Sequence, residues 1–321
     1  MKNFKMNNMA RGAGERRRQN PAAKACVFLL PVLLCINCAA VSALESGARF
    51  LRIDTDARAV SMGAAYTAMA SGVESLAYNP AGLSAVKGVE LGFSHTNWLM
   101  DSMHDFIGVA VPVKGKPLAI GFGLTRLSNG SMDARSADRS AGGSFSSYDQ
   151  AVTVGMAGML GKYRLGLNVK YVESAIAGDK ARAGAVDIGF NRSLNNIPAG
   201  IGMSVQNLGT KMKYISQEDP LPLTVAAGLM FSVIPGVNLA LDVKRLVYDK
   251  QTGVSFGTEY ALLSGVALRA GYLAGDRAVN INNTGFSAGA GLNFWGTQLD
   301  YAVNPYGALG NTQKITLKKK F

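Results

Sequence analysis

The chain has 321 residues, a formal net charge of +12 and only 17% charged residues. Soluble domains usually carry about 25% charged residues, so this sequence is poor in charge for its length. About half of the excess positive charge lies in the first 43 residues, which hold seven Lys or Arg side chains and a single acid, Glu15. Because the remaining excess is spread thinly apart from Lys318–Lys320, the composition excludes a basic surface of the kind that binds nucleic acid.

The N-terminal segment has the parts of a secretory signal peptide. Arg16–Arg18 and Lys24 form a basic region, residues 25–41 form an apolar region, and small residues precede a cleavage site after Ala43. The apolar region is slightly shorter than the roughly 20 residues of a transmembrane helix, so an uncleaved anchor is the weaker alternative. We therefore predict that residues 1–43 are a signal peptide. All three cysteines lie in it, so no disulfide or cysteine metal site is expected in the mature chain.

After residue 87, apolar and polar residues alternate, which is typical of strands with one apolar and one polar face. In Lys162–Val172, for example, apolar or aromatic residues occupy every second position. Most of these runs have about the 9–11 residues with which a tilted strand crosses a bilayer. About fourteen such runs are present: 88–98, 104–113, 117–128, 148–160, 162–174, 183–194, 198–208, 221–233, 236–247, 252–263, 265–274, 285–295, 297–303 and 311–321.

The connections between these runs are alternately short and long. A tight turn at Lys114–Lys116, for example, is followed by longer polar segments at 129–147 and 175–182. Outer-membrane barrels have short periplasmic turns and longer external loops, and Phe321 at the end of the last run resembles their insertion signal. The sequence thus predicts an all-β fold, an antiparallel transmembrane barrel of about 14 strands over residues 88–321. A soluble β-sandwich is the weaker alternative because its strands are usually shorter.

Residues 44–87 have a different pattern. Apolar or small residues recur with helical spacing over 57–73, and the predicted helix ends near Gly72. Asn79 then precedes Pro80, and a residue before proline is pushed out of helical conformation, so a sharp turn is expected there. We interpret residues 44–87 as a small helical hatch, or plug, in the barrel lumen. A helix packed against a sheet is the alternative.

Three stretches in this region resemble the start of the PorV/PorQ family, which belongs with the FadL-like outer-membrane barrels: Gly47–Leu51, Ala57–Ala68 and Ala77–Leu83. Leu268–Tyr272 is similar to a late-strand motif of the same family. The resemblance implies a barrel of this strand number with an N-terminal hatch that carries an Asn-Pro-Ala element. Relatives often have two acidic residues after the helix, where this chain has Ser71–Glu74. The hatch residues that the resemblance assigns to gating or ligand contact are Arg58, Met62, Gly63, Tyr66, Asn79, Pro80 and Gly82.

The sequence lacks the common catalytic and phosphate-binding motifs. His95 and His104 are its two histidines, and there is no histidine pair at metal-ligand spacing, no Gly-x-Ser-x-Gly elbow and no Gly-rich phosphate loop. We therefore expect a protein that is not an enzyme and that holds no metal and no cofactor. A phospholipase-like site built on one of the histidines is the alternative, but no serine lies at a recognisable spacing.

The resemblance implies a location in the bacterial outer membrane and a choice between functions. As a FadL-like channel, the protein would allow passive uptake of hydrophobic small molecules such as long-chain fatty acids, with the hatch around Asn79 shifting to open a passage. As a PorV-like partner or shuttle, it would accept secreted proteins from a type IX secretion system. A structural or surface barrel with a sealed lumen is the third reading. The expected partners are outer-membrane lipid, hydrophobic small molecules, the barrel-assembly machinery during insertion and, in the PorV-like case, secreted proteins.

Overall fold

The computed structural model describes residues 46–321 except 136–140, 195–196, 215, 263–264 and 276–284. The predicted signal peptide lies outside the described residues. Among the helices within this part of the chain, none is long and apolar enough to cross a membrane.

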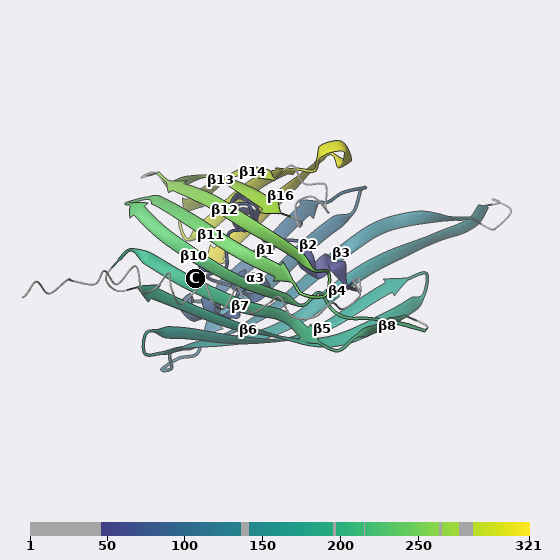
Figure 1. Cartoon of the computed structure of the whole chain (residues 1–321), viewed down its shortest axis with the longest axis horizontal. Helices are drawn as coiled ribbons and strands as arrows, with labels where there is room; N and C mark the ends of the chain where they lie inside the picture. The colour runs from purple at the N-terminus through teal and green to yellow at the C-terminus, as the bar shows by residue number, and fades with distance from the viewer. Residues whose placement is uncertain (1–45, 136–140, 195–196, 215, 263–264, 276–284) are drawn as a thin grey trace, which may run out of the picture. The chain divides into compact units, whose positions relative to one another are not determined.

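The described strands form a closed antiparallel barrel of fourteen strands (Figure 1). Strands adjacent in sequence pair with each other, β10 pairs with β7, and β1 closes the barrel against β16. The predicted fold class is therefore confirmed. The barrel strands are β1 (Glu90–Asn97), β2 (Met103–Pro112), β3 (Leu118–Arg135), β4 (Ala141–Leu160), β5 (Tyr163–Ile176), β6 (Asp179–Leu194), β7 (Ala199–Gly209), β10 (Thr224–Ile234), β11 (Val237–Leu246), β12 (Gln251–Ala261), β13 (Val266–Gly275), β14 (Phe286–Phe294), β15 (Thr297–Pro305) and β16 (Asn311–Lys320).

Side chains alternate between the lumen and the outer wall, as the period-two pattern predicted. On β5 the polar positions from Arg164 to Lys170 face the lumen, where Asn168 and Lys170 are buried. The outward positions from Tyr163 to Tyr171 are apolar or aromatic and are at least 40% exposed. An outward apolar run with an aromatic residue at each end is typical of barrels that cross an outer membrane.

The two ends of the barrel differ in their connections. The connections that follow β2, β4, β6, β10, β12 and β14 are short, and we call this end the turn end. Phe321 lies there, because its N–H donates to the Val89 carbonyl oxygen just before β1. We call the opposite end the loop end. The described chain starts at the loop end, where Ser46 bonds to Asp249 after β11.

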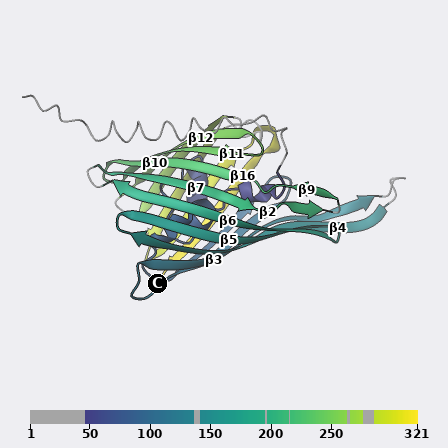
Figure 2. The ribbon, with the colours of Figure 1, turned by 60° about the horizontal axis from the view of Figure 1, so that its bottom comes forward.

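Two of the predicted long loops are wrong. Most of 129–147 is strand, because β3 and β4 continue to pair after a bulge, and Figures 1 and 2 show this pair extending past its neighbours. The predicted loop 175–182 is a two-residue turn at Ala177 and Gly178, with φ of 50° and 96°. Positive φ at both positions suits a tight hairpin, but alanine seldom adopts it, so the sequence marks only the second turn position, by Gly178.

The connection between β7 and β10 contains a small hairpin of its own. Within it, β8 (Met212–Tyr214) and β9 (Gln217–Asp219) pair with each other as a separate two-stranded sheet. Met212 at its start is buried with Phe50 and with inward residues of β4 to β6. The hairpin is thus folded against the inner side of the barrel wall. The last short element, η3 (Gly307–Leu309), lies in the connection between β15 and β16.

The segment before β1 fills the lumen as a series of short helices (Figure 1). They are η1 (Arg49–Arg52), α2 (Ala57–Ser61), α3 (Ser75–Tyr78) and η2 (Pro80–Ala85). The predicted long helix over 57–73 is wrong. After α2, Gly63 and Ala64 have φ of 64° and 65°, and an α-helix does not continue through left-handed residues.

The core lies between this hatch and the inner wall. One buried cluster joins Leu76 and Leu83 of the hatch to Phe106 and to small residues of β2, β3 and β4. Inward glycines let the hatch approach the wall: a Cβ added at Gly257 would lie 2.7 Å from the Met62 Cβ, and one at Gly271 would overlap the Gly63 amide nitrogen. The absence of a side chain at these inward positions thus allows the hatch to lie directly against the wall.

Candidate functional site

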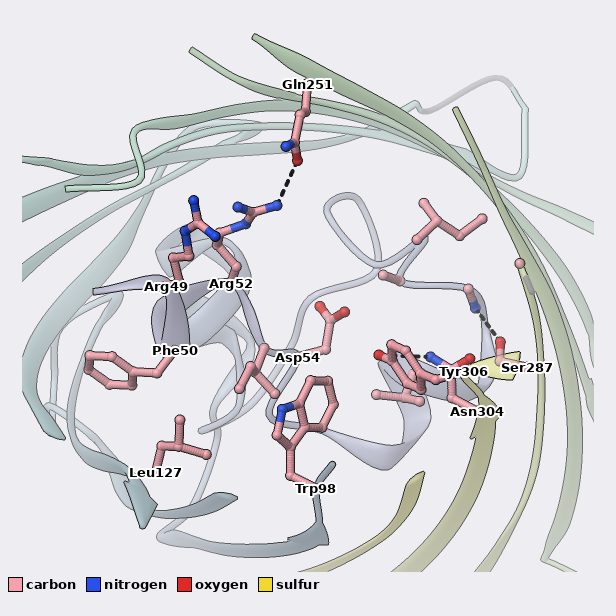
Figure 3. A pocket seen from close by; sticks show the side chains of 16 residues that line it. Arg49, Phe50, Arg52, Asp54, Trp98, Leu127, Gln251, Ser287, Asn304 and Tyr306 are labelled. Atoms are coloured by element: carbon pink, nitrogen blue, oxygen red, sulfur yellow. Dashed lines mark hydrogen bonds between the residues drawn. The ribbon is translucent and has the colours of Figure 1, made fainter. Parts of the chain in front are cut away.

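A cavity of about 420 Å³ lies between η1 and the loop end of the barrel (Figure 3). We call it the loop-end cavity. Its walls come from η1, from the β1–β2 and β15–β16 connections, and from the loop-end parts of β3, β12, β13 and β14. Apolar and polar side chains both line it, a composition typical of small-molecule sites. Its lining includes Arg49, Phe50, Arg52, Ile53, Trp98 and Leu127.

Two cationic side chains lie together on one side of this cavity. Figure 3 shows Arg49 and Arg52 together, facing Asn304 and Tyr306 across the space. Arg52 Nη2 donates to Gln251 Oε1 at 2.7 Å, and Arg49 Nε donates to the Ser46 carbonyl oxygen at 3.4 Å. On the opposite side the ring of Trp98 packs edge-on against Tyr306 with a centroid distance of 5.3 Å. The cavity therefore combines cationic donors with aromatic surface.

A narrower space of about 50 Å³ continues from this cavity toward the hatch. The two spaces share Phe50, Arg52, Ile53 and Asp54, so they adjoin. The narrow space reaches α3, where Gln206 Nε2 donates to the Ala77 carbonyl oxygen at 2.7 Å. A ligand that left the loop-end cavity would thus meet the hatch at α3.

A third space of about 280 Å³ lies on the other side of the hatch, near the turn end. We call it the turn-end hollow. Hatch residues 68–71 form one of its walls, and the inward residues Arg164 and Asn191 belong to the opposite wall. The hatch therefore separates two spaces that lie at opposite ends of the lumen.

Asn79 occupies the boundary between these spaces. Its Nδ2 lies 2.9 Å from the Thr67 carbonyl oxygen, 3.1 Å from that of Phe190 and 3.0 Å from Asn191 Oδ1 in the turn-end hollow. Its Oδ1 accepts from the Ala81 N–H at 3.2 Å and so caps η2. One side chain thus holds two hatch segments and the wall together.

At the neighbouring motif residues Pro80 and Gly82, the hatch backbone packs closely against β5 and against another part of the hatch. Pro80 is the first residue of η2, where its missing N–H costs nothing, and its backbone lies against Gly166 of β5. A Cβ at Gly82 would overlap the Ala70 carbonyl oxygen. These residues therefore shape the hatch and do not line either large space.

Four of the ionic or polar contacts between the hatch and the wall lie between residues 58 and 74. Arg58 binds Glu259 through two hydrogen bonds of 2.7 Å. The N–H groups of Tyr66 and Thr67 donate to Asp242 Oδ2 at 2.9 and 2.8 Å. The remaining two are Lys244 Nζ to the Ala64 carbonyl oxygen at 2.7 Å, and Lys318 Nζ to Glu74 Oε2 at 2.7 Å.

Met62, Gly63 and Tyr66 form the buried centre of the hatch. Met62 and Tyr66 are fully buried in one cluster with Tyr78, whose ring meets that of Tyr66 edge-on at 5.1 Å. Burial raises the pKa of Tyr66 to about 12, with Arg58 opposing the shift, so this phenol stays neutral. Gly63 donates its N–H to Ser287 Oγ at 3.0 Å and is the one residue of this trio beside the loop-end cavity.

The predicted hatch residues therefore build the hatch between the two spaces and attach it to the barrel wall. Gly63 contributes to the loop-end cavity, Arg58 to the turn-end hollow, and Phe321 lies 70% exposed at the turn end. Sequence reasoning missed the cavity lining. Arg49 and Phe50 lie in a stretch that resembles the family, but Trp98, Gln251 and Tyr306 come from loop-end segments that only barrel closure brings together.

The two histidines lie on opposite faces of the barrel. His95 Nδ1 is 2.6 Å from Asp105 Oδ1 on the outer wall, whereas His104 is buried on the lumen side. Among the described residues, neither histidine hydrogen-bonds to a serine. Over the same residues, no group of three or more His, Cys, Asp or Glu side chains is placed to hold a metal ion.

No protein-family model matches the sequence, and no curated protein matches it. The fold, in contrast, is similar to solved structures. The crystal structure of the Ralstonia pickettii toluene transporter TbuX matches with a TM-score of 0.61 at 12% identity, covering 82% of this chain and 97% of that chain. The P. putida toluene transporter TodX matches with a TM-score of 0.56 at 14% identity, covering 81% and 98%. The chain therefore has a FadL-like fold, a closed fourteen-stranded antiparallel barrel of the kind seen in TbuX and TodX.

Proposed function

We propose that the protein is an outer-membrane channel for passive uptake of hydrophobic small molecules. The observation that carries the proposal is the loop-end cavity, an amphipathic space above a hatch that separates it from the turn-end hollow. The apolar outer wall supports a membrane location, and the two similar structures are described as toluene transporters. The loop end would face outward and the turn end the periplasm, since external loops are the longer ones in such barrels.

The loop-end cavity suits a cargo with an apolar body. Phe50, Ile53 and Leu127 supply apolar surface, and Trp98 adds an aromatic face. Burying apolar cargo area there gains about 25 cal/mol per Å² removed from water. Cargo would therefore concentrate in this cavity before it passes the hatch.

Transfer to the turn-end hollow requires the hatch to move. The hydrogen bonds of Asn79 hold the segment between the two spaces, so a shift of the hatch around Asn79 and Pro80 would join them. Gating by this segment is part of the proposal. A passive channel needs no catalytic group, and we propose that the protein is not an enzyme.

Within this class, long-chain fatty acids are the cargo we propose. Arg49 and Arg52 lie together beside the apolar lining, and a guanidinium group binds carboxylates well. An aromatic hydrocarbon would use the apolar lining alone. Binding of a fatty acid should therefore depend on these arginines, and binding of an aromatic hydrocarbon should not.

Tryptophan fluorescence tests the channel proposal, because the chain has only two tryptophans. Trp98 lines the loop-end cavity, and Trp295 is 92% exposed in the turn between β14 and β15. Trp295→Phe leaves Trp98 as the only reporter, and Trp98→Phe is the matched control. A brominated fatty acid and bromobenzene serve as quenching probes.

We expect at least one probe to quench Trp98 saturably, and Trp295 to show only the weak, linear quenching of a ligand dissolved in the detergent. Liposomes that contain the protein should also take up the probe that binds. Absence of saturable Trp98 quenching together with absence of uptake would contradict the proposal.

A PorV-like role is the second candidate, and the stretch Ala77–Leu83 is the observation that favours it. In that role the barrel would receive secreted proteins from a type IX machine. A genome that encodes no type IX components would eliminate this candidate. For either role we propose insertion by the barrel-assembly machinery with Phe321 as part of the signal, so Phe321→Ala is expected to lower the amount of assembled barrel.

A further inference from the structure

On β3 to β6 the outward residues change from apolar to polar or charged between one outward position and the next along each strand. Leu124, Val152 and Tyr171 are direct cross-strand neighbours and continue the apolar outward runs. Two residues further toward the loop end, Arg126 pairs with Gln150, Gln150 with Glu173, and Glu173 with Arg182. At this step β3, β4 and β5 change from an apolar or aromatic to a polar outward side chain, and β6 changes from Gly184 to Arg182.

These polar residues point away from the lumen. Leu127, next to Arg126, lines the loop-end cavity, and Val172, next to Glu173, belongs to an inner buried cluster. Ala181 and Ala183, on either side of Arg182, are in the same inner cluster. Because neighbouring side chains alternate across a strand, the polar residues face the outside of the barrel.

Six side chains form one connected group, which we call the outer-wall cluster: Arg126, Tyr148, Tyr171, Glu173, Lys180 and Arg182. Glu173 accepts from Tyr148 Oη at 3.0 Å and from Arg182 Nε at 3.0 Å, and Lys180 Nζ lies 3.5 Å away. The Arg126 guanidinium lies 4.7 Å from the centroid of the Tyr148 ring. One carboxylate and one aromatic ring therefore gather three cations.

The cluster has donors left for a ligand. Lys180 and Arg182 are 46% and 60% exposed, whereas Glu173 is 8% exposed beneath them. Glu173 binds Arg182 through Nε, and the terminal nitrogens of that guanidinium make no hydrogen bond within the described part of the chain. Arg126 is exposed and makes no hydrogen bond to another described residue. Asp105, its cross-strand partner, is 2.6 Å from His95.

We propose that the outer-wall cluster is a binding site for the phosphate groups of lipid A in the outer leaflet. Arginine and lysine are the side chains that bind phosphate best, and they stand here directly beside an apolar wall that suits acyl chains. The cluster would bind the phosphate groups of a lipid, and the neighbouring apolar positions on the same four strands would contact its acyl chains. The site rests on the proposed outer-membrane location with the loop end outward.

Binding of purified lipid A to the full mature chain tests this site. Bisphosphorylated lipid A is titrated into delipidated protein, with monophosphoryl lipid A and phosphatidylglycerol as comparison lipids, and bound lipid is counted by native mass spectrometry. The test variant is Arg126→Gln/Lys180→Gln/Arg182→Gln. The charge-matched control removes three cations elsewhere at the loop end: Lys213→Gln/Arg245→Gln/Lys250→Gln.

We expect bisphosphorylated lipid A to bind most tightly and the test variant to lose about tenfold or more in affinity, because charge-assisted phosphate contacts are lost. The control variant should bind like the wild type. Heat-modifiable migration on gels verifies that each barrel is folded, and Arg126→Gln and Arg182→Gln alone replace the triple variant if it does not fold.

Three results would overturn the site: equal affinity in wild type and test variant, equal loss in test and control variants, or equal binding of all three lipids. Trp98 quenching is measured on the same samples and does not involve the outer wall. Loss of quenching with intact lipid A binding would contradict the channel alone, and intact quenching without lipid A binding would contradict this site alone.

Discussion

Arg58 of the hatch and Glu259 of β12 form a bidentate pair, with Nε donating to Oε2 and Nη2 to Oε1, both at 2.7 Å. Glu259 also accepts from Arg269 Nε at 2.7 Å, and Arg269 Nη1 donates to Asp300 Oδ1 at 2.7 Å. The pair thus joins α2 to a buried ionic network of the wall. The hatch is therefore held by specific side chains as well as by close packing.

Arg58→Gln is expected to loosen the hatch while the barrel stays folded. Glu259 keeps Arg269 as a cationic partner, but the hatch loses two hydrogen bonds between charged groups, each worth about 1.5–3 kcal/mol. Hydrogen exchange of the amides of residues 57–70 should accelerate, and exchange of the barrel strands should not. Arg245→Gln, on the outer side of β11, is the control and should leave hatch exchange unchanged; equal acceleration in both variants would contradict the anchoring role.

Asn79→Ala is expected to release the partition between the two lumen spaces. The variant loses the η2 cap and the contacts of Nδ2, each hydrogen bond being worth about 0.5–1.5 kcal/mol. Because the proposed passage opens when this segment shifts, small-solute flux in a liposome swelling assay should rise. Asn97→Ala, at an exposed position on β1, is the control. Unchanged flux in a folded Asn79→Ala barrel would argue against gating at this residue.

Gly271→Ala and Gly184→Ala form a matched pair that tests the close approach of hatch and wall. A Cβ at Gly271 would overlap the Gly63 backbone, whereas one at Gly184 meets nothing within 4 Å. Overpacking of this kind costs about 1–3 kcal/mol, so Gly271→Ala should lower hatch protection, and Gly184→Ala should not. If Gly271→Ala leaves hatch exchange as in the wild type, the hatch is not seated against this strand.

Sequence alone predicted the barrel well because a strand with one lumen face and one lipid face imposes a period of two, which survives without any knowledge of partners. It failed where backbone conformation is set by a distant contact. Gly63 and Ala64 interrupt the helical pattern because the chain there lies against β13, and no local signal reveals that wall. The loop-end cavity was not predicted for the same reason, since Arg52, Trp98 and Tyr306 come together only when the barrel closes.

The arginines of the loop-end cavity should distinguish two classes of cargo. Arg49→Gln/Arg52→Gln is expected to weaken quenching of Trp98 by a brominated fatty acid about tenfold, because the carboxylate loses charge-assisted hydrogen bonds. Bromobenzene carries no charge, and its quenching should stay unchanged. Leu127→Ala, which removes apolar lining, should weaken both probes. Equal loss for both probes in the arginine variant would mean that the arginines shape the cavity and do not select a carboxylate.

The Glu74 carboxyl should make hatch stability depend on pH. Burial raises the pKa of Glu74 to about 7, with Lys318 opposing the shift and Asp56 adding to it. In the unfolded chain the carboxyl titrates near 4.5, so the folded state holds its proton more tightly. The resulting stabilisation is fully present below about pH 4.5 and is lost as pH rises through about 7.

Glu74→Gln isolates this contribution, because glutamine keeps the shape and does not titrate. After correction for intrinsic exchange rates, hatch protection in the wild type should fall between pH 5 and pH 8 by more than it does in Glu74→Gln. The other buried acids, such as Asp242, contribute equally to both proteins and cancel in the comparison. Parallel pH profiles in the two proteins would mean that Glu74 stays ionised beside Lys318 across this range, and that the buried pair is a permanent anchor of the hatch.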